Sequence, residues 1–185
     1  MTLTILTASG SLRAASCHTA LLTLARRLAG PDLAVADPYP IGELPFYNDD
    51  FDQPGLEPAP VLAWRAAIAA ADAVLFACPE YNYGPTPVLK NAFDWATRPF
   101  GKHPMKGKPL AIIGGGGKGG GVNVQEYFER IAPALGCVMA NEPQIAIANI
   151  RDEVNPDGTV KDPNIEAAVS ARLAALAALT GSAPL

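Results

Sequence analysis

The sequence predicts a three-layer α/β fold with a five-stranded parallel sheet in the strand order 2-1-3-4-5. Short apolar runs that favour strands alternate with helical patterns five times along the 185 residues. Parallel strands joined by helices need right-handed crossovers, which place helices on both faces of the sheet. Five strands and this length favour that order over the larger six-stranded dinucleotide fold, and we expect one domain over residues 1–185.

Composition and charge exclude several classes of protein. Hydrophobic residues make up 49% of the chain and charged residues 17%, which is ordinary for a globular α/β protein. The formal net charge is −4 and the basic residues are scattered, so we expect binding to neither nucleic acid nor an anionic membrane. The chain shows no apolar run long enough for a membrane span and no signal-peptide pattern, which predicts a cytoplasmic protein. Three widely spaced cysteines and two histidines away from ligand spacing predict neither disulfides nor a metal site.

Hydrophobic periodicity places the individual elements. The predicted strands are residues 3–8, 33–36, 73–77, 109–113 and 138–147, the last with a candidate bend at Glu142-Pro143. The predicted helices are residues 17–28, 61–71, 87–97, 122–135 and 163–179.

In the first half of the chain, turn residues and one long loop separate these elements. Gly30 and Pro31 stop the first helix. The loop over residues 37–58 is long and carries Phe46, Tyr47 and Phe51, which give it apolar surface to bury. Loops of this length carry function or cover an interface, and both outcomes stay open.

In the second half, capping residues mark the helices. Thr86 is the predicted N-cap of a helix, with a hydroxyl that can accept a backbone N–H, and Pro87 suits the first turn because its missing N–H costs nothing there. Residues 114–121 contain seven glycines in eight positions, so we expect a mobile segment. Asp162 caps the last helix, and Gly181 ends it.

Three unusual loops follow the first, third and fourth strands, which are neighbours in the predicted order. These loops are the hydroxyl-rich residues 9–16, the tyrosine-rich residues 78–87 and the glycine-rich residues 114–121. Ligands in open α/β sheets bind outside the carboxyl ends of the strands, at the switch between strands 1 and 3. We therefore expect the three loops to converge on one crevice.

The first loop has the composition of a monophosphate site. Ser9, Ser11, Arg13 and Ser16 stand just ahead of a helix start, where free N–H groups and the positive end of the helix dipole favour an anion. The serines could instead be simple N-caps, and the residues alone leave both interpretations open.

The tyrosine loop has the composition of a site for a planar heteroaromatic ligand. Pro79, Glu80, Tyr81 and Asn82 combine a stiff backbone, flat aromatic faces and several hydrogen-bonding groups. The competing interpretation is a proline-rich turn whose tyrosines cover the sheet edge.

The glycine run is a weak motif by itself. It matches G-x-G-x-x-G, as any glycine run does, and no Ser or Thr follows Lys118 to complete a Walker pattern. We interpret Gly114, Gly115 and Gly116 as backbone that lies close against a flat ring, and the rest as a flexible connection.

Three sequence motifs together resemble the NADPH-dependent FMN reductases of flavodoxin-like fold, a family that includes quinone, chromate and azo-dye reductases. The motifs are Gly10-Ser-Leu-Arg13 followed by Ser16, Pro79-Glu-Tyr-Asn-Tyr83, and Val88-Leu-Lys-Asn-Ala92 followed by Asp94-Trp95. The resemblance extends loosely over residues 3–179. It implies a flavodoxin-like fold, FMN as bound cofactor, and NADPH or NADH as co-substrate.

The resemblance also implies roles for residues of this chain. Ser11, Arg13 and Ser16 would hold the FMN phosphate, with Leu12 contributing backbone. His18 replaces the Asn that is usual in the family and would face the phosphate, although a histidine in the first turn of a helix could instead point to solvent. The flavin ring would be framed by Pro79, Glu80, Tyr81 and Asn82, with Gly114, Gly115 and Gly116 closing its other edge. A further departure is Pro85-Thr86-Pro87, where the family usually has Ile-Pro-Gly.

Five further residues are expected to serve the structure. Lys90, Asn91 and Asp94 would fix the helix behind the ring. Trp64 and Trp95 are expected in the core or at an interface.

The function that follows from the resemblance is an FMN-dependent NAD(P)H oxidoreductase. It would transfer a hydride by way of flavin N5 to a quinone or a similar small-molecule acceptor, with ping-pong kinetics and without catalytic side chains of its own. The family implies a homodimer or homotetramer. The alternative class is a non-enzymatic flavodoxin-like electron carrier or flavin-binding sensor.

Overall fold

The computed structural model describes residues 2–140, 142 and 144–181. Its main sheet has the order β2-β1-β3-β5-β6, and all the pairs between these strands are parallel. The strands are β1 (Leu3–Ser9), β2 (Leu33–Pro38), β3 (Ala73–Tyr81), β5 (Pro109–Gly115) and β6 (Val138–Met139). Since β4 is a short hairpin strand beside β3, the predicted order 2-1-3-4-5 is confirmed.

The predicted fifth strand is divided into two short pieces. β6 pairs with the start of β5 at Pro109 and Leu110, whereas β7 (Ala146–Ile147) pairs with its end at Gly114 and Gly115. The continuous strand predicted for residues 138–147 is therefore wrong over its middle. The predicted bend includes Pro143, which lies outside the described residues.

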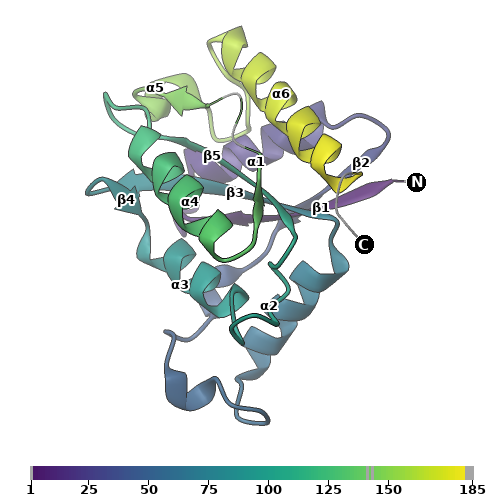
Figure 1. The fold of residues 1–185 in the computed structure, drawn as a ribbon. Coiled ribbons are helices and arrows are strands. Elements are labelled where there is room, and N and C mark those ends of the chain that lie inside the picture. Colours follow the sequence, from purple (N-terminus) through teal and green to yellow (C-terminus); the bar gives the residue numbers. More distant parts are fainter. Residues whose placement is uncertain (1, 141, 143, 182–185) are drawn as a thin grey trace.

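Helices cover both faces of the sheet (Figure 1). They are α1 (Cys17–Leu28), α2 (Ala59–Ala70), α3 (Pro87–Ala96), α4 (Val122–Ala134), α5 (Ile150–Glu153) and α6 (Pro163–Thr180). Buried residues of α1 and α6 form one apolar cluster with one face of the sheet, and those of α2, α3 and α4 form the other. The short helix α5 was not predicted from the sequence.

The central strand explains the unbroken apolar run that the sequence shows. β3 lies between β1 and β5, and its side chains from Ala73 to Cys78 are fully buried. A parallel strand covered on both faces has no polar side to alternate with. Trp64 and Trp95 are fully buried in the apolar cluster under α2, α3 and α4. Of the two places predicted for them, core or interface, they occupy the core.

The tyrosine loop is more regular than the sequence suggests. β3 continues to Tyr81, and β4 (Gly84–Pro85) returns antiparallel to it, with Tyr81 paired to Gly84. Asn82 and Tyr83, the two residues of the turn, have φ values of 50° and 65°. Both angles suit the tight two-residue hairpin turn that matches strand twist. The segment is therefore a rigid hairpin and not an irregular loop.

The long loop after β2 is tied down along most of its length. It contains two 3-10 turns, η1 (Ile41–Glu43) and η2 (Asp49–Phe51). Asn91 of α3 accepts a hydrogen bond from Tyr47 N at 2.8 Å and donates one to Pro45 O at 2.9 Å. Its predicted structural role is confirmed, and the loop covers the apolar core beside α3.

Charged pairs hold the same region. Arg65 of α2 lies 2.6 Å from the Asp52 carboxylate, and its guanidinium also donates to Trp95 O. On α3, Lys90 and Asp94 pair at 2.6 Å, as expected for structural residues one helical turn apart.

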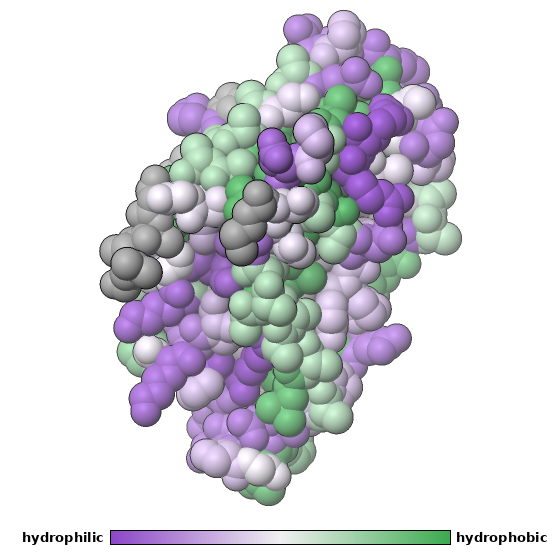
Figure 2. Space-filling model, turned by 90° about the vertical axis from the view of Figure 1, so that its right-hand side faces the viewer, coloured by the Kyte–Doolittle hydropathy of each residue, from purple (hydrophilic) through white to green (hydrophobic). Residues whose placement is uncertain are grey.

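The surface mixes polar groups with small apolar residues. Figure 2 shows a pale green stripe in the lower half of one face, where α2 lies, flanked by hydrophilic residues. The exposed side of α2 consists mostly of alanines, which accounts for part of the high apolar content. None of the helices in the described residues has the length and hydropathy of a membrane span.

Candidate functional site

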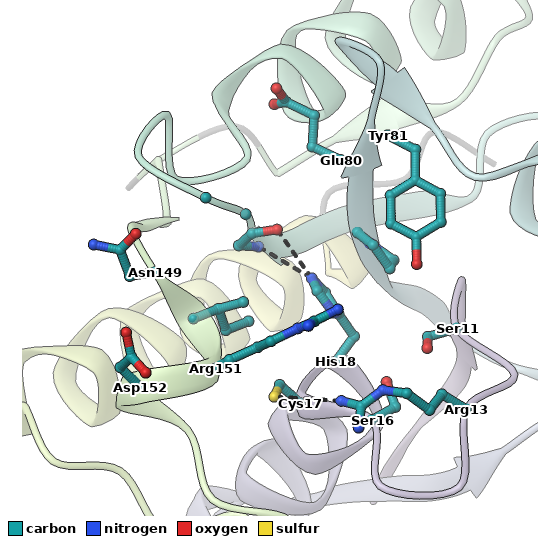
Figure 3. A pocket seen from close by; sticks show the side chains of 15 residues that line it. Ser11, Arg13, Ser16, Cys17, His18, Glu80, Tyr81, Asn149, Arg151 and Asp152 are labelled. Carbon is teal, nitrogen blue, oxygen red and sulfur yellow. Dashed lines mark hydrogen bonds between the residues drawn. The ribbon is translucent and has the colours of Figure 1, made fainter.

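A cavity of about 390 Å³ opens at the carboxyl ends of the central strands. Four segments contribute to it: the loop after β1, the end of β3, the glycine segment after β5, and the turn into α5 (Figure 3). Its volume lies in the range of small-molecule sites. The cavity forms at the place predicted from the strand order, where loops after strands 1, 3 and 4 of the main sheet meet.

The loop after β1 is organised by its own serines. Ser9 is buried, and its hydroxyl accepts from Thr19 Oγ1 at 2.9 Å and from Ser11 N at 3.3 Å. Ser16 is the N-cap of α1, with its Oγ accepting from Thr19 N at 3.3 Å. Ser16 also lines the cavity, so the two interpretations left open for this serine, N-cap and site residue, do not exclude each other.

The start of α1 is electropositive. Its first turn contains no acidic residue, so the positive end of the dipole and the first N–H groups that Ser16 does not cap meet no negative side chain of that turn. Arg13 adds a full positive charge, and its guanidinium lies 3.8 Å from the Cys17 thiol. Ser11, Arg13 and Ser16 therefore line one wall with hydroxyl and cationic groups suited to a phosphate.

His18 lies inside the protein and does not point to solvent. Its side chain is buried, and Nε2 lies 3.1 Å from Gly115 O and 3.3 Å from Gly115 N. Burial lowers the pKa of His18 to about 4, which the bond to Gly115 opposes and the nearby Arg13 charge reinforces. His18 is thus a neutral link between the start of α1 and the end of β5.

Glu80 is tied to the start of α4. Its carboxylate accepts from Asn123 N and Asn123 Nδ2, both at 2.9 Å. In Figure 3 this carboxylate points away from the other labelled side chains, whereas the Tyr81 hydroxyl points toward the loop that carries Ser11. The carboxylate takes the place of an N-cap side chain, since Gly121 at the N-cap position has none.

The glycine segment is hydrogen-bonded to the turn before α5. Gly116 N donates to Ile147 O, and the N–H groups of Asn149 and Ile150 donate to Gly117 O and Gly116 O. The mobile connection predicted from the glycine content is, in the structure, a segment fastened by backbone bonds.

Most of its glycines are required by close packing. A Cβ on Gly114 would lie 2.7 Å from Cys78 O, and one on Gly115 would lie 2.5 Å from Ile150 Cδ1. Gly120 and Gly121 have φ values of 65° and 79°. Gly117 differs, because a Cβ there would meet nothing within 4 Å and the residue lines the cavity.

Nine of the twelve predicted binding residues line the cavity. These are Ser11, Arg13, Ser16, His18, Pro79, Glu80, Tyr81, Gly115 and Gly116. The other three lie outside its lining: Leu12 packs on Gly42, Asn82 is in the hairpin turn, and Gly114 is in the sheet against Cys78.

Six lining residues were missed from the sequence: Cys17, Gly117, Asn149, Ile150, Arg151 and Asp152. The last four follow β7, which pairs in parallel with the end of β5, so they lie at the same edge of the sheet as the other loops. The strand-end rule that selected the other loops could have found them.

Known proteins are similar to this chain in sequence and in fold. The family model described as NADPH-dependent FMN reductase matches residues 3–152. An NAD(P)H-dependent FMN reductase of Pseudomonas aeruginosa is 38% identical over 175 residues, which cover 93% of this chain and 92% of that protein. A 2-hydroxy-1,4-benzoquinone reductase of a Burkholderia species is 37% identical over 161 residues, 86% of each protein.

A solved structure is similar over the whole chain. The flavoenzyme NAD(P)H:(acceptor) oxidoreductase FerB of Paracoccus denitrificans matches with a TM-score of 0.87 and 33% identity, covering 99% of this chain and 100% of that one. Fold and sheet order thus define a flavodoxin-like α/β protein. The chain belongs to the NADPH-dependent FMN reductase family and is an oxidoreductase that uses FMN with NAD(P)H as co-substrate.

Proposed function

We propose that the protein is an FMN-dependent NAD(P)H:quinone oxidoreductase whose FMN binds in the cavity at the carboxyl end of the sheet. The observation that carries the proposal is the convergence of Ser11, Arg13 and Ser16 with the glycine segment on one cavity. The quinone acceptor is suggested by the relatives named quinone reductases, including one from Escherichia coli that is 32% identical over 155 residues.

The residues present fit this cofactor. Hydroxyls, a guanidinium and the start of a 12-residue helix offer hydrogen-bond donors to a phosphate at one wall. At another wall, Gly117 leaves open the space that a Cβ would fill, so a flat ring could approach the backbone there. Bound FMN would supply the redox chemistry, accepting a hydride at N5 and passing two electrons to the acceptor.

The side chains then bind and orient, and none needs to exchange a proton. Ser11, Ser16 and Arg13 would fix the phosphate end, and the Tyr81 ring, which is 57% exposed, would stand at the mouth of the cavity. The His18 imidazole holds Gly115 at the inner end. One accessible side of the cavity would have to serve donor and acceptor in turn, which predicts ping-pong kinetics.

Steady-state kinetics with varied NAD(P)H and quinone test this proposal. We expect parallel lines in double-reciprocal plots, and anaerobic NAD(P)H should bleach the flavin absorbance of the purified protein. If photochemically reduced protein passes electrons to quinone while NAD(P)H never reduces it, the protein is an electron carrier and the proposal fails.

We further propose, on the family resemblance, a cytoplasmic homodimer or homotetramer. Sedimentation analysis of the FMN-loaded protein would show a monomer if this part of the proposal is wrong.

A further inference from the structure

The cavity is lined by a second arginine that the sequence motifs do not include. Arg151 belongs to α5, on the side of the cavity opposite the loop that carries Arg13. Figure 3 shows its side chain extending from α5 across the cavity, toward the side where His18 and Ser16 lie. Two guanidinium groups thus reach into one cavity from two different segments.

Neither guanidinium has a carboxylate partner among the residues that the structure describes. Among the ion pairs of the described residues, none includes Arg13 or Arg151. The Arg151 guanidinium also makes no hydrogen bond to the described residues, although it carries five N–H donors. An unpaired arginine directed into a cavity is available to an anionic ligand.

The two carboxylates that line the cavity do not neutralise this pair. Glu80 is bound by the backbone and side-chain N–H groups of Asn123 and points away in Figure 3. The Asp152 carboxylate lies on the Asn149 side of α5, while Arg151 extends in the other direction. His18 is held neutral by burial, so the charge inside the cavity is dominated by the two arginines.

The positive charge of two arginines and a helix start balances the charge of a dianion better than the charge of one arginine would. A phosphate monoester carries between −1.5 and −2 charge at pH 7 and has three strong acceptor oxygens. Ser11, Ser16 and Arg13 line the cavity on the side of the loop after β1 and would reach a phosphate from that side only. An arginine from α5 would close the other side with paired N–H donors.

We infer that Arg151 is a phosphate-binding residue of the cavity, which holds the FMN phosphate together with Arg13. The inference rests on the proposed function, since it assigns the phosphate end of the cofactor. It makes α5, a short helix that the sequence did not predict, part of the binding site.

The test compares FMN with riboflavin, which differ only in the phosphate. The full chain, freed of flavin, is titrated with each flavin and binding is measured by quenching of flavin fluorescence. We expect Arg151→Ala to weaken FMN binding by about tenfold or more and to leave riboflavin binding unchanged, because a charge-assisted hydrogen bond is lost. Arg151→Lys should recover part of the FMN affinity, and Lys161→Ala, which removes a positive charge outside the cavity lining, should change neither affinity.

Competition with inorganic phosphate provides a second test. It should compete with FMN in the native protein and compete more weakly in Arg151→Ala. If Arg151→Ala lowers FMN and riboflavin affinity by the same factor, or lowers neither, the inference is wrong while the proposed function stands. A change confined to the preference for NADPH over NADH would also overturn it, by assigning Arg151 to the nucleotide. If the native protein binds neither flavin, the proposed function itself fails.

Discussion

At the scale of single residues, His18 makes a contact within the protein at a position where the family usually has an asparagine. The family's usual asparagine could only donate and accept through an amide, whereas the imidazole here reaches the end of β5 and is bound to Gly115. The sequence suggested a histidine facing either a phosphate or solvent. The solvent alternative is wrong, because the side chain is buried, and contact with the phosphate stays a prediction.

We predict that His18 makes the ligand-free protein sensitive to acid. A pKa of about 4 in the folded state against about 6.5 unfolded means that the unfolded state binds the proton first as pH falls. The stability from neutral His18 is therefore complete above about pH 6.5 and is lost as pH falls toward 4. Between pH 7 and pH 5 the loss should be roughly 2 kcal/mol.

Urea unfolding of the native protein and of His18→Asn at these two pH values measures this effect. Asparagine does not titrate, so the variant should lose less stability on acidification than the native protein. An equal loss in both proteins would show that His18 titrates normally in the folded state.

Gly117 allows a second prediction at this scale. The position has space for a methyl group and lacks the left-handed backbone of Gly120 and Gly121, so Gly117→Ala should keep the unfolding free energy or raise it by about 0.4–1 kcal/mol. The same holds for Gly119→Ala, which serves as the matched control because Gly119 does not line the cavity. Only Gly117→Ala should weaken FMN binding in a fluorescence titration. Equal FMN affinity in the two variants would remove Gly117 from the site.

At the scale of elements, the site is held together by contacts between segments far apart in the chain. Glu80, at the end of β3, caps α4 through Asn123, 43 residues later. The glycine segment between β5 and α4 is fastened to the turn before α5 by three backbone hydrogen bonds. Each wall of the cavity therefore depends on another element for its position.

We predict that Glu80→Ala lowers the unfolding free energy by about 1–2 kcal/mol, because the first turn of α4 loses its only side-chain cap among the described residues. Glu126→Ala is the control, since Glu126 is an exposed acid on the same helix whose carboxylate makes no hydrogen bond to the described residues. Urea midpoints of the two variants give the comparison. Similar midpoints would mean that the carboxylate of Glu80 does not stabilise α4.

At the scale of the whole molecule, the strand order was predictable because it depends on patterns that local residues carry. Alternating apolar runs, helical patterns and the Thr86-Pro87 helix start sufficed for the sheet order. They also placed both ends of α1, α2, α3, α4 and α6 within two residues. The three loops were selected by strand-end position and composition, and eight of the residues chosen in them line the cavity, together with His18 of α1.

The sequence by itself determined the family, the sheet order and the three loops, after β1, β3 and β5, that meet at the cavity. Only the tertiary structure decided which groups turn into the cavity. Glu80 turns to α4, Leu12 packs on Gly42 and Arg151 reaches inward, because each side chain follows partners supplied by distant segments. Likewise, glycines that read as flexible are held in place, since the spacing between β5, β3 and α5 leaves no room for a Cβ at Gly114 or Gly115. Local patterns specify elements, whereas side-chain direction depends on contacts that exist only once those elements are packed.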